Sequence, residues 1–324
     1  QLLKMVERTG DLAPLDLEIR LAREEDFEEV VAMSSGIFDG MDYLPAKYHS
    51  WLQEHNRFVL LGKKGGKVVA LESAFIIDDG ETAVLEGLRV APWERGKGIA
   101  KVIQRHCTDF LKNHYPGVNK AREETGLDQL ENLMKNNILN HNRALYLRFK
   151  TEDIQKVIEG LMMKLIQSEE YYKPVTLQAD QVRRIYLDSK VIESLLPAKT
   201  IIQNWQPLKP LNTNLNILLD RGSTWLADSI DNPTFLSLDA YPHRVPLEEG
   251  YRFNIDLFGK NLTGAKNLFL GHIQSLPKSL NAVVFCLVHF DPSLKEGMVE
   301  FYEKIPGLER FNVCLEQLLL EEEI

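Results

Sequence analysis

The sequence predicts a mixed α/β fold built from two similar halves. Strand-like and helix-like patterns alternate along nearly the whole chain, which is typical of sheets covered by helices. In the first half, Gly65-Gly66 and Asp78-Asp79-Gly80 separate strand-like runs, and short glycine turns of this kind indicate antiparallel hairpins. A length of 324 residues also favours two domains, since one domain holds roughly 100–200 residues.

The first half begins with a strand and a helix, passes a turn-rich segment at Asp39–Tyr48, and continues with three consecutive strands and a helix. Gly40 and Pro45 are the breakers that mark this turn-rich segment. A further strand and helix close the half. The expected strands are Leu17–Leu21, Arg57–Lys63, Lys67–Asp78, Ala83–Val90 and Ala144–Phe149, and the expected helices are Asp26–Ser35, Ile99–Leu111 and Glu152–Gln167.

The second half has a similar order of elements, after a polar segment at Ser168–Thr176 that contains Pro174. The expected domains are therefore 1–168 and 175–324. Residue identity between the halves is not visible, so duplication and a chance similarity of order both stay open. The expected helices are Ala179–Leu196, Leu262–Leu276 and Leu294–Ile305, and the expected strands are Thr200–Trp205, Ser223–Ile230, Thr234–Tyr241, Tyr251–Phe258, Ala282–His289 and Phe311–Leu320.

Composition excludes several classes of protein. A hydrophobic share of 44% and a charged share of 26% are ordinary for a folded domain. A net charge of −9 argues against nucleic-acid or anionic-lipid partners, and no run approaches the roughly 18 apolar residues that span a membrane. The 3 cysteines are far apart and show neither disulfide nor metal spacing, which favours a reducing, cytoplasmic setting without a metal.

The most informative segment is Leu85–Ala100, in which a strand ends at Val90 and Arg95–Ala100 (RGKGIA) opens a helix. Glycines let backbone N–H groups approach a ligand closely, and the first N–H groups of a helix attract anions. Arg95 and Lys97 add positive charge to an otherwise acidic protein. The segment therefore predicts an anion site suited to a pyrophosphate, although a glycine turn that merely starts a helix gives the same pattern.

The order of strand, V-x-P, R-x-x-G-x-A and helix resembles motif A of the GNAT acetyltransferase superfamily. The resemblance implies tandem GNAT-like domains and acetyl-CoA as the co-substrate. It also implies a bulge near Gly87 that splays the strand beside the cofactor. The implied cofactor-binding residues are Leu88 and Val90 through their main chains, and Arg95, Gly96, Lys97, Gly98, Ile99 and Ala100 around the pyrophosphate.

A closer resemblance covers most of the chain. Motifs in both halves are similar to those of the vertebrate histidine N-acetyltransferase family, which moves acetyl from acetyl-CoA to the α-amine of L-histidine. The motifs are DGMDYLPAKYHSWL (39–52), VVALES (68–73), DDGET (78–82), VLEGLRVAP (84–92), KTIIQNWQP (199–207) and EQLLLEEEI (316–324). Segment 119–142 departs from the superfamily pattern, because the strand expected after Gly117 has almost no apolar signal. A diverged paralogue with another acceptor is therefore an alternative.

The resemblance implies chemistry that requires a base, because an α-amine is largely protonated near pH 7. Glu86 and Glu72 are the candidate bases. Glu86 lies two residues before Leu88, so the two are expected on one face, and Glu72 lies in the neighbouring strand. Two carboxylates near one cleft would raise at least one pKa; the alternative is that either lies on the solvent face. Tyr146 is the candidate acid for the thiolate leaving group, with a core tyrosine as its alternative.

Acceptor recognition is expected from Asp42, Tyr43 and Arg89. Asp42 suits a protonated amine or imidazole, and Arg89 suits a carboxylate. Asp42 and Tyr43 lie in the turn-rich segment, where loops often carry recognition. An ordinary turn aspartate, or an arginine on the far side of the sheet, explains the same residues without a function.

The sequence thus predicts a cytoplasmic acyltransferase that acts on a small-molecule amine, with a second domain that lacks the cofactor motif, since GKNLTGAKN follows its strand Tyr251–Phe258. Two alternatives stay open. One is a GNAT enzyme that acetylates peptide N-termini or lysine, and the other is a CoA-binding pseudoenzyme or scaffold. The sequence does not indicate an oligomeric state.

Overall fold

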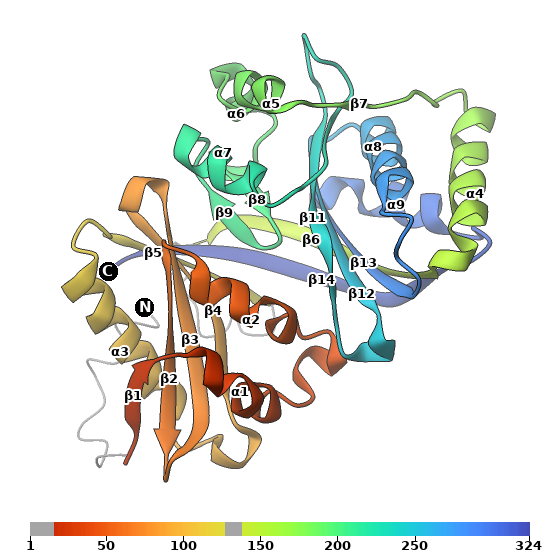
Figure 1. The fold of residues 1–324 in the computed structure, drawn as a ribbon. Coiled ribbons are helices and arrows are strands. Elements are labelled where there is room, and N and C mark those ends of the chain that lie inside the picture. Colours follow the sequence, from red (N-terminus) through yellow and green to blue (C-terminus); the bar gives the residue numbers. More distant parts are fainter. Residues whose placement is uncertain (1–15, 127–137) are drawn as a thin grey trace. The chain divides into compact units, whose positions relative to one another are not determined.

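The computed structural model describes residues 16–126 and 138–324, which form two compact units (Figure 1). The first unit takes the described residues up to Ile138 together with Val245–Leu247 and Leu319–Ile324, and the second takes Leu139–Arg244 and Glu248–Leu318. Each unit therefore includes residues from the other half of the sequence. The division at Ile138 lies ahead of the segment 168–175 that the composition marks as a boundary, because β6 and α4 pack within the second unit.

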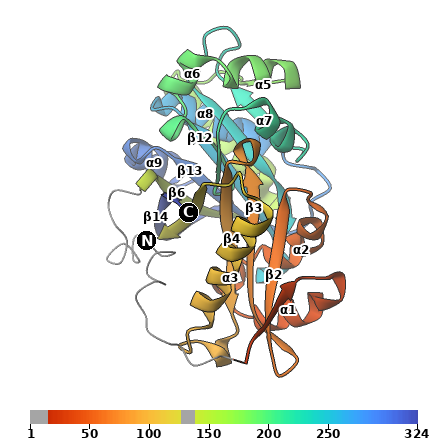
Figure 2. The same ribbon diagram turned by 90° about the vertical axis from the view of Figure 1, so that its left-hand side faces the viewer.

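The first unit is a sheet with helices on both faces (Figure 2). Strands β1 to β4 are antiparallel neighbours, β5 runs parallel to β4, and residues 319–323 of β14 follow β5. Helices α1 and α2 cover one face and α3 covers the other. The elements are β1 (Glu18–Leu21), α1 (Phe27–Met33), α2 (Leu44–Gln53), β2 (Arg57–Lys64), β3 (Lys67–Ile77), β4 (Thr82–Val90), α3 (Ile99–His114) and β5 (Lys120–Gly126).

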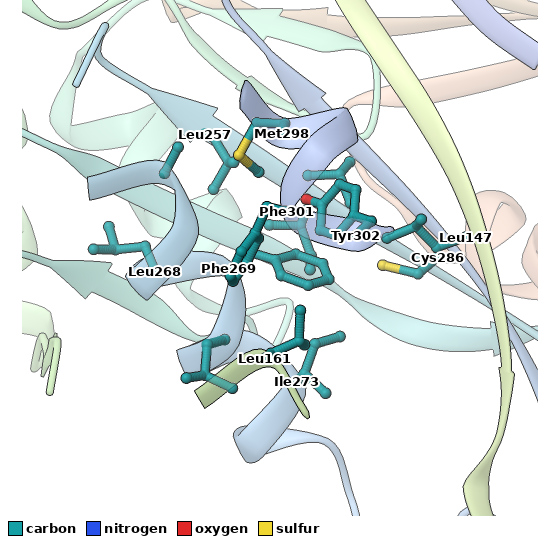
Figure 3. Close-up of a cluster of buried hydrophobic side chains, with 14 of the residues drawn as sticks. Leu147, Leu161, Leu257, Leu268, Phe269, Ile273, Cys286, Met298, Phe301 and Tyr302 are labelled. Atoms are coloured by element: carbon teal, nitrogen blue, oxygen red, sulfur yellow. The ribbon is translucent and has the colours of Figure 1, made fainter. Parts of the chain in front are cut away.

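The sheet strands of the second unit lie in the order β14, β6, β13, β12, β11, β10 and β7. Its core lies between that sheet and helices α4, α8 and α9, where Phe269, Phe301 and Tyr302 are fully enclosed (Figure 3). The elements are β6 (Ile138–Lys150), α4 (Ile154–Gln167), β7 (Val175–Thr176), α5 (Ala179–Tyr186), α6 (Ser189–Ser194), β8 (Ile201–Gln203), β9 (Gln206–Leu208), α7 (Asn212–Leu219), β10 (Trp225–Ala227), β11 (Leu236–Arg244), β12 (Tyr251–Phe258), α8 (Leu262–Ser275), β13 (Val283–Phe290), α9 (Lys295–Tyr302) and β14 (Leu308–Glu323).

The two units share one topology, which confirms that the order of elements is repeated. In the first, β2, β3 and β4 are antiparallel and α3 crosses to the parallel strand β5. In the second, β10, β11 and β12 are antiparallel and α8 crosses to the parallel strand β13. Helix α3 and helix α8 therefore occupy equivalent places, directly after the central strand of each unit.

Two sequence expectations in the first unit need correction. The segment Asp39–Tyr48, expected as turns, contains the start of helix α2, because Pro45 lies in the first helical turn, where it removes no hydrogen bond. Segment 119–142, expected without a strand, contains β5, since parallel pairing with β4 and burial of Ala121 stabilise a sequence with little apolar signal. Residues 127–137 of that segment lie outside the described part of the chain.

Across the described ranges, no helix is both long and apolar enough to cross a membrane.

Candidate active site

Strand β4 carries a bulge at Gly87, where the sequence places it. Ser73 of β3 pairs with Glu86, and Leu71 pairs with Arg89, so Gly87 and Leu88 together face the single residue Glu72. Gly87 has a φ of +82°, a conformation that suits glycine. A Cβ there would lie 3.1 Å from the Trp51 ring. The bulge therefore requires glycine for two reasons: the positive φ and the lack of space for a Cβ beside the Trp51 ring.

The bulge changes which residues share a face, and it corrects the expectation that Glu86 and Leu88 point the same way. The extra residue places Glu86 and Arg89 on the face of Ser73, which is covered by α2, whereas Leu88 is 41% exposed. The regular alternation of a strand fails here because two residues of β4 oppose one of β3.

The parallel pairing of β4 with β5 ends before the bulge. Within the described residues it runs from Thr82–Lys120 to Val84–Arg122 only, although β4 continues to Val90 and β5 to Gly126. The main chain of β4 from Leu85 onward is thus not in the β5 ladder. This is the side of the strand on which the sequence places the cofactor.

Segment Arg95–Ala100 connects β4 to helix α3, whose first two residues are Ile99 and Ala100. Gly96 and Gly98 have φ values of +76° and +82°, and a Cβ on Gly96 would meet no atom within 4 Å. The N–H groups of the first turn of α3 have no acceptor inside the helix. These backbone groups form an open, positively polarised end of a helix of the kind that binds phosphates.

The charged side chains of the loop fold back onto the backbone around it. Arg95 Nε donates to the carbonyl oxygen of Val90 at 3.1 Å, and Lys97 Nζ donates to the carbonyl oxygen of Trp93 at 3.1 Å. Lys97 also lies 3.3 Å from Glu94, a carboxylate that Lys64 contacts as well. Both cations are exposed and stand beside the helix end, so they can turn toward an anion at little cost.

The acceptor residues expected from the sequence come together on the α2 face. Arg89 forms an ion pair with Asp42 and donates to the carbonyl oxygen of Gly87 at 2.9 Å. Its guanidinium lies 5.1 Å from the centre of the Tyr43 ring, and Asp42 also accepts from the N–H of Leu44 at 3.0 Å. The alternative that Arg89 lies on the opposite face of the sheet from Glu86 is wrong, because the bulge places both residues on the same face.

Two buried polar atoms of this group have no hydrogen-bond partner among the described residues: Oδ2 of Asp42 and Nε of Arg89. Both residues are nearly inaccessible, at 3% exposure each. An unsatisfied buried polar atom is costly, typically by about 1–3 kcal/mol. The pair therefore contains one acceptor and one donor that no described residue of the protein satisfies.

Glu86 is held by a residue that sequence reasoning missed, Arg57. The Arg57 guanidinium pairs with Glu86 and with Glu54, and it is enclosed between the rings of Trp51 and Phe75 at 4.3 and 4.6 Å. A signal was present, because Arg57 begins the apolar strand RFVLLG, where an arginine needs an acidic partner.

Glu72, the second candidate base, lies on the opposite face from Glu86. It is only 2% exposed, and burial, reinforced by the neighbouring charge of Glu123, raises its pKa to about 8. Its charge also acts on Cys107 of α3, which places it on the α3 side. The expectation of two carboxylates in one cleft is therefore wrong for this pair, because alternate residues of β3 point to opposite faces and Glu72 is next to Ser73.

Tyr146, the candidate acid, belongs to the second unit. It lies on β6 opposite Leu287 of β13, between Leu145 and Leu147, which point into the core.

The second unit differs from the first at the two corresponding positions, the pairing of the parallel strands and the start of the helix between them. Its parallel pairing of β12 with β13 is continuous from Tyr251–Val284 to Asp256–His289. At the start of α8, Asn261 accepts from the N–H of Gly264 at 3.2 Å, and a Cβ on Gly264 would lie 2.7 Å from Phe235. No open glycine loop precedes this described helix.

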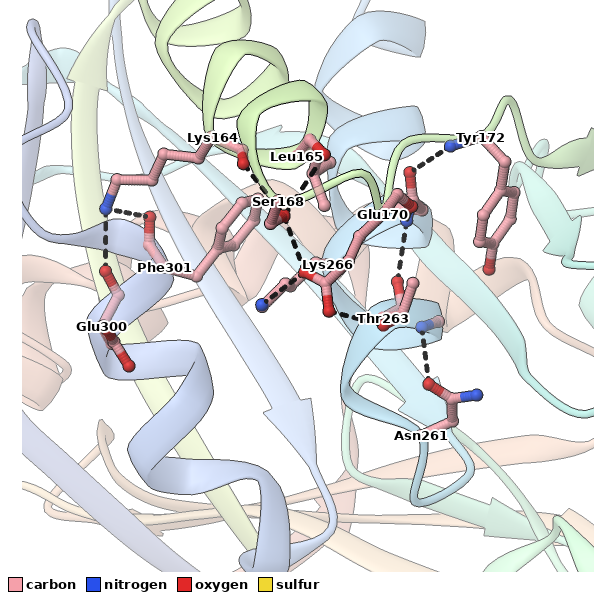
Figure 4. A network of polar contacts seen from close by, with 12 residues as sticks. Lys164, Leu165, Ser168, Glu170, Tyr172, Asn261, Thr263, Lys266, Glu300 and Phe301 are labelled. Atoms are coloured by element: carbon pink, nitrogen blue, oxygen red, sulfur yellow. Dashed lines mark hydrogen bonds and ion pairs between the residues drawn. The ribbon is translucent and has the colours of Figure 1, made fainter.

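A carboxylate of the protein itself occupies the start of α8 (Figure 4). Glu170 accepts from Thr263 Oγ1 and from Lys266 Nζ, each at 2.9 Å. The hydrogen bond from Lys266 lowers the pKa of Glu170, so the group is an anion at neutral pH. The start of α8, which corresponds to the start of α3, thus carries a carboxylate of the protein itself in its first turns.

Among the residues that the structure describes, no group of three or more His, Cys, Asp or Glu side chains is arranged to hold a metal ion.

Comparison with known proteins agrees with this geometry. Residues 22–133 match the model of the acetyltransferase (GNAT) family, and residues 170–291 match that of the histidine N-acetyltransferase C-terminal domain. The histidine N-acetyltransferase of Scomber australasicus is 41% identical over 99% of this chain and 98% of its own. The probable N-acetyltransferase 16 of Homo sapiens is 38% identical over 97% and 87%.

Solved structures show the same fold at low sequence identity. A putative acetyltransferase from Pyrococcus horikoshii has a TM-score of 0.57 and 13% identity, and covers 98% of this chain and 93% of its own. A tandem GNAT protein from the clavulanic acid biosynthesis pathway has a TM-score of 0.54 and 11% identity, with 95% and 98% covered. The fold is therefore that of tandem GNAT-like domains, of which the second lacks the cofactor motif.

Proposed function

Because the chain belongs to the family of histidine N-acetyltransferases, we propose that it transfers acetyl from acetyl-CoA to the α-amine of a free amino acid, L-histidine first. One observation carries the proposal. Strand β4 brings a bulged backbone, a group of alternating charges and an anion-binding helix end into succession within Glu86–Ala100. Acetyl-CoA and a zwitterionic amino acid need these features side by side.

The residues of the loop fit the pyrophosphate of acetyl-CoA. The N–H groups of Gly96, Gly98 and Ala100 and the side chains of Arg95 and Lys97 would hold it, since a Cβ-free backbone leaves the helix end accessible. The main chains of Leu88 and Val90 would bind the pantetheine arm along the unpaired side of β4. Acetyl-CoA supplies the activated acetyl group as a thioester.

Asp42, Tyr43 and Arg89 would hold the acceptor. A bound amino acid carries a carboxylate and protonated nitrogens, which match the unsatisfied Nε of Arg89 and Oδ2 of Asp42. Tyr43 stacks with Phe38 at a ring distance of 6.2 Å and supplies an aromatic wall suited to an imidazole ring.

Glu86 is the proposed base. It takes a proton from the α-ammonium group, and the neutral nitrogen then attacks the thioester carbonyl carbon. A new C–N bond forms as the C–S bond breaks, and a backbone N–H at the bulge stabilises the oxyanion in between. The ammonium nitrogen loses two protons in all: one leaves through Glu86 to water, and the other balances the CoA thiolate as a thiol.

Glu72 and Tyr146 are the remaining candidates for that second proton. With a pKa of about 8, Glu72 carries its proton at pH 7, which disfavours it as a base and suits it as a donor. Tyr146 stays a candidate acid from the second unit.

The test is thiol release from acetyl-CoA across free amino acids and short peptides, with Glu86→Gln beside the wild type. Glu28→Gln, at an exposed position of α1, is the matched control. Histidine-dependent release that Glu86→Gln lowers by about 100-fold or more supports the proposal. Release with peptides alone would move the function to peptide acetylation. Binding of acetyl-CoA with no release for any acceptor would indicate a pseudoenzyme.

A further inference from the structure

We propose that Arg57 is a positioning residue of the transfer reaction, which holds the Glu86 carboxylate beside the bulge, and that Glu54 tunes this hold by competing for the same guanidinium. The inference rests on the proposed function, because it gives Glu86 a partner in its role as the base.

Contacts on several sides hold the Arg57 side chain in its orientation. Its side chain is 1% exposed, and the rings of Trp51 and Phe75 lie on it at 4.3 and 4.6 Å. Its Nε donates to Glu54 at 2.6 Å, and one terminal nitrogen donates to Ser73 Oγ at 3.2 Å and to Glu86 Oε1. A planar guanidinium fixed in this way also fixes the carboxylates that it binds.

The same contacts tie Glu86 to the bulge. Trp51, which stacks on Arg57, also packs where a Cβ of Gly87 would be. Ser73 receives a hydrogen bond from Arg57 and donates one to the carbonyl oxygen of Glu86 at 2.9 Å. Arg57 therefore holds both the side chain of Glu86 and, through Ser73, its backbone.

Accessibility distinguishes this ion pair from an ordinary buried one. The Glu86 side chain is 18% exposed while that of Arg57 is 1% exposed, so the carboxylate is the member that an incoming amine can reach. The Glu54 side chain, 31% exposed, shares the cation from the C-terminal end of α2. Burial alone would lower the pKa of Arg57, but Glu86 and Glu54 together raise it above its ordinary value.

Other charged groups also act on this face. Asp42 and Arg89 lie on the far side of Gly87, and Tyr43 is close enough for the charge of Glu86 to affect it. Arg89 forms its ion pair with Asp42, and Arg57 forms an ion pair with Glu86. The position of the Glu86 carboxylate should therefore depend on the Arg57 contact.

The test is steady-state thiol release, with kcat measured separately from the KM for acetyl-CoA. Arg57→Gln removes the group that holds the Glu86 carboxylate and should lower kcat by about 10-fold or more with little change in that KM. Arg57→Lys keeps the charge and should restore part of kcat. Glu54→Gln leaves the guanidinium to Glu86 alone and should keep or raise kcat.

Glu24→Gln, which removes a carboxylate from the exposed pair with His49, is the matched control and should leave kcat and KM unchanged. An unchanged kcat in Arg57→Gln, or a lowered kcat in Glu54→Gln, would overturn the proposal. The Glu54 side chain is partly exposed, so Glu54→Gln is expected to fold and tests the proposal even if Arg57→Gln does not fold. The proposed function fails separately, if Glu86→Gln keeps wild-type turnover.

Discussion

Replacing Glu72 with glutamine should stabilise the protein by a margin that grows with pH. Burial raises the pKa of Glu72 from 4.5 to about 8, so between these values the folded protein holds a proton that the unfolded chain has released. Stability then falls as pH rises through this window, since the folded state binds more protons. Glutamine has no titrating proton, so the stability of the variant does not decrease with pH for this reason.

The size of the effect follows from the same values. One pH unit of pKa difference corresponds to about 1.4 kcal/mol, so a change from 4.5 to about 8 sets a ceiling on the order of 5 kcal/mol. Local relaxation and the coupled titration of Glu123, whose pKa burial raises to about 7, reduce what is measured. We expect about 2 kcal/mol between the two ends of the window.

Urea unfolding of the wild type and Glu72→Gln at about pH 5 and about pH 9 measures the difference. The buried amide adds a constant cost, so the change with pH is the quantity to compare, and Glu28→Gln serves as an exposed control. A stability difference that stays the same at both pH values would refute the assignment of Glu72 as a buried neutral acid.

Two further predictions concern β4 and its loop. Gly87→Ala should lower stability by about 1–3 kcal/mol and nearly abolish turnover, because alanine is strained at φ +82° and meets the Trp51 ring. Thermal unfolding and thiol release measure the two effects, and wild-type activity would contradict the role of the bulge. Lys97→Ala should raise the KM for acetyl-CoA by about 3- to 10-fold with little change in kcat. Lys101→Ala, at an exposed position of α3, is the control, and an unchanged KM in Lys97→Ala would remove Lys97 from the pyrophosphate site.

The sequence was informative where local signals and the fold agree. Glycine turns and alternating apolar residues predicted β2, β3 and β4, and the glycines of Arg95–Ala100 predicted the loop before α3. The bulge at Gly87 was predictable too, through the family resemblance, because only a glycine fits that backbone.

Long-range contacts explain what the sequence did not reveal. Strand β5 is polar, and it forms because β4 offers a parallel partner. The faces of Glu86 and Leu88 follow from one extra residue, which shifts the alternation in a way that no pattern count detects. Arg57 and Glu86 are 29 residues apart in sequence, so their pairing depends on the register of β2, β3 and β4.

The distribution of the chain between its units has a consequence for synthesis on the ribosome. Residues 319–324 belong to the first unit, where Glu321 binds Lys120 and Arg122 and Ile324 donates to Asn119. Ribosomes add about 5–20 residues per second, so β5 waits about 10–40 s for this neighbour while residues 139–318 are made. During translation one edge of β5 therefore lacks its strand neighbour for this interval, on the side away from β4.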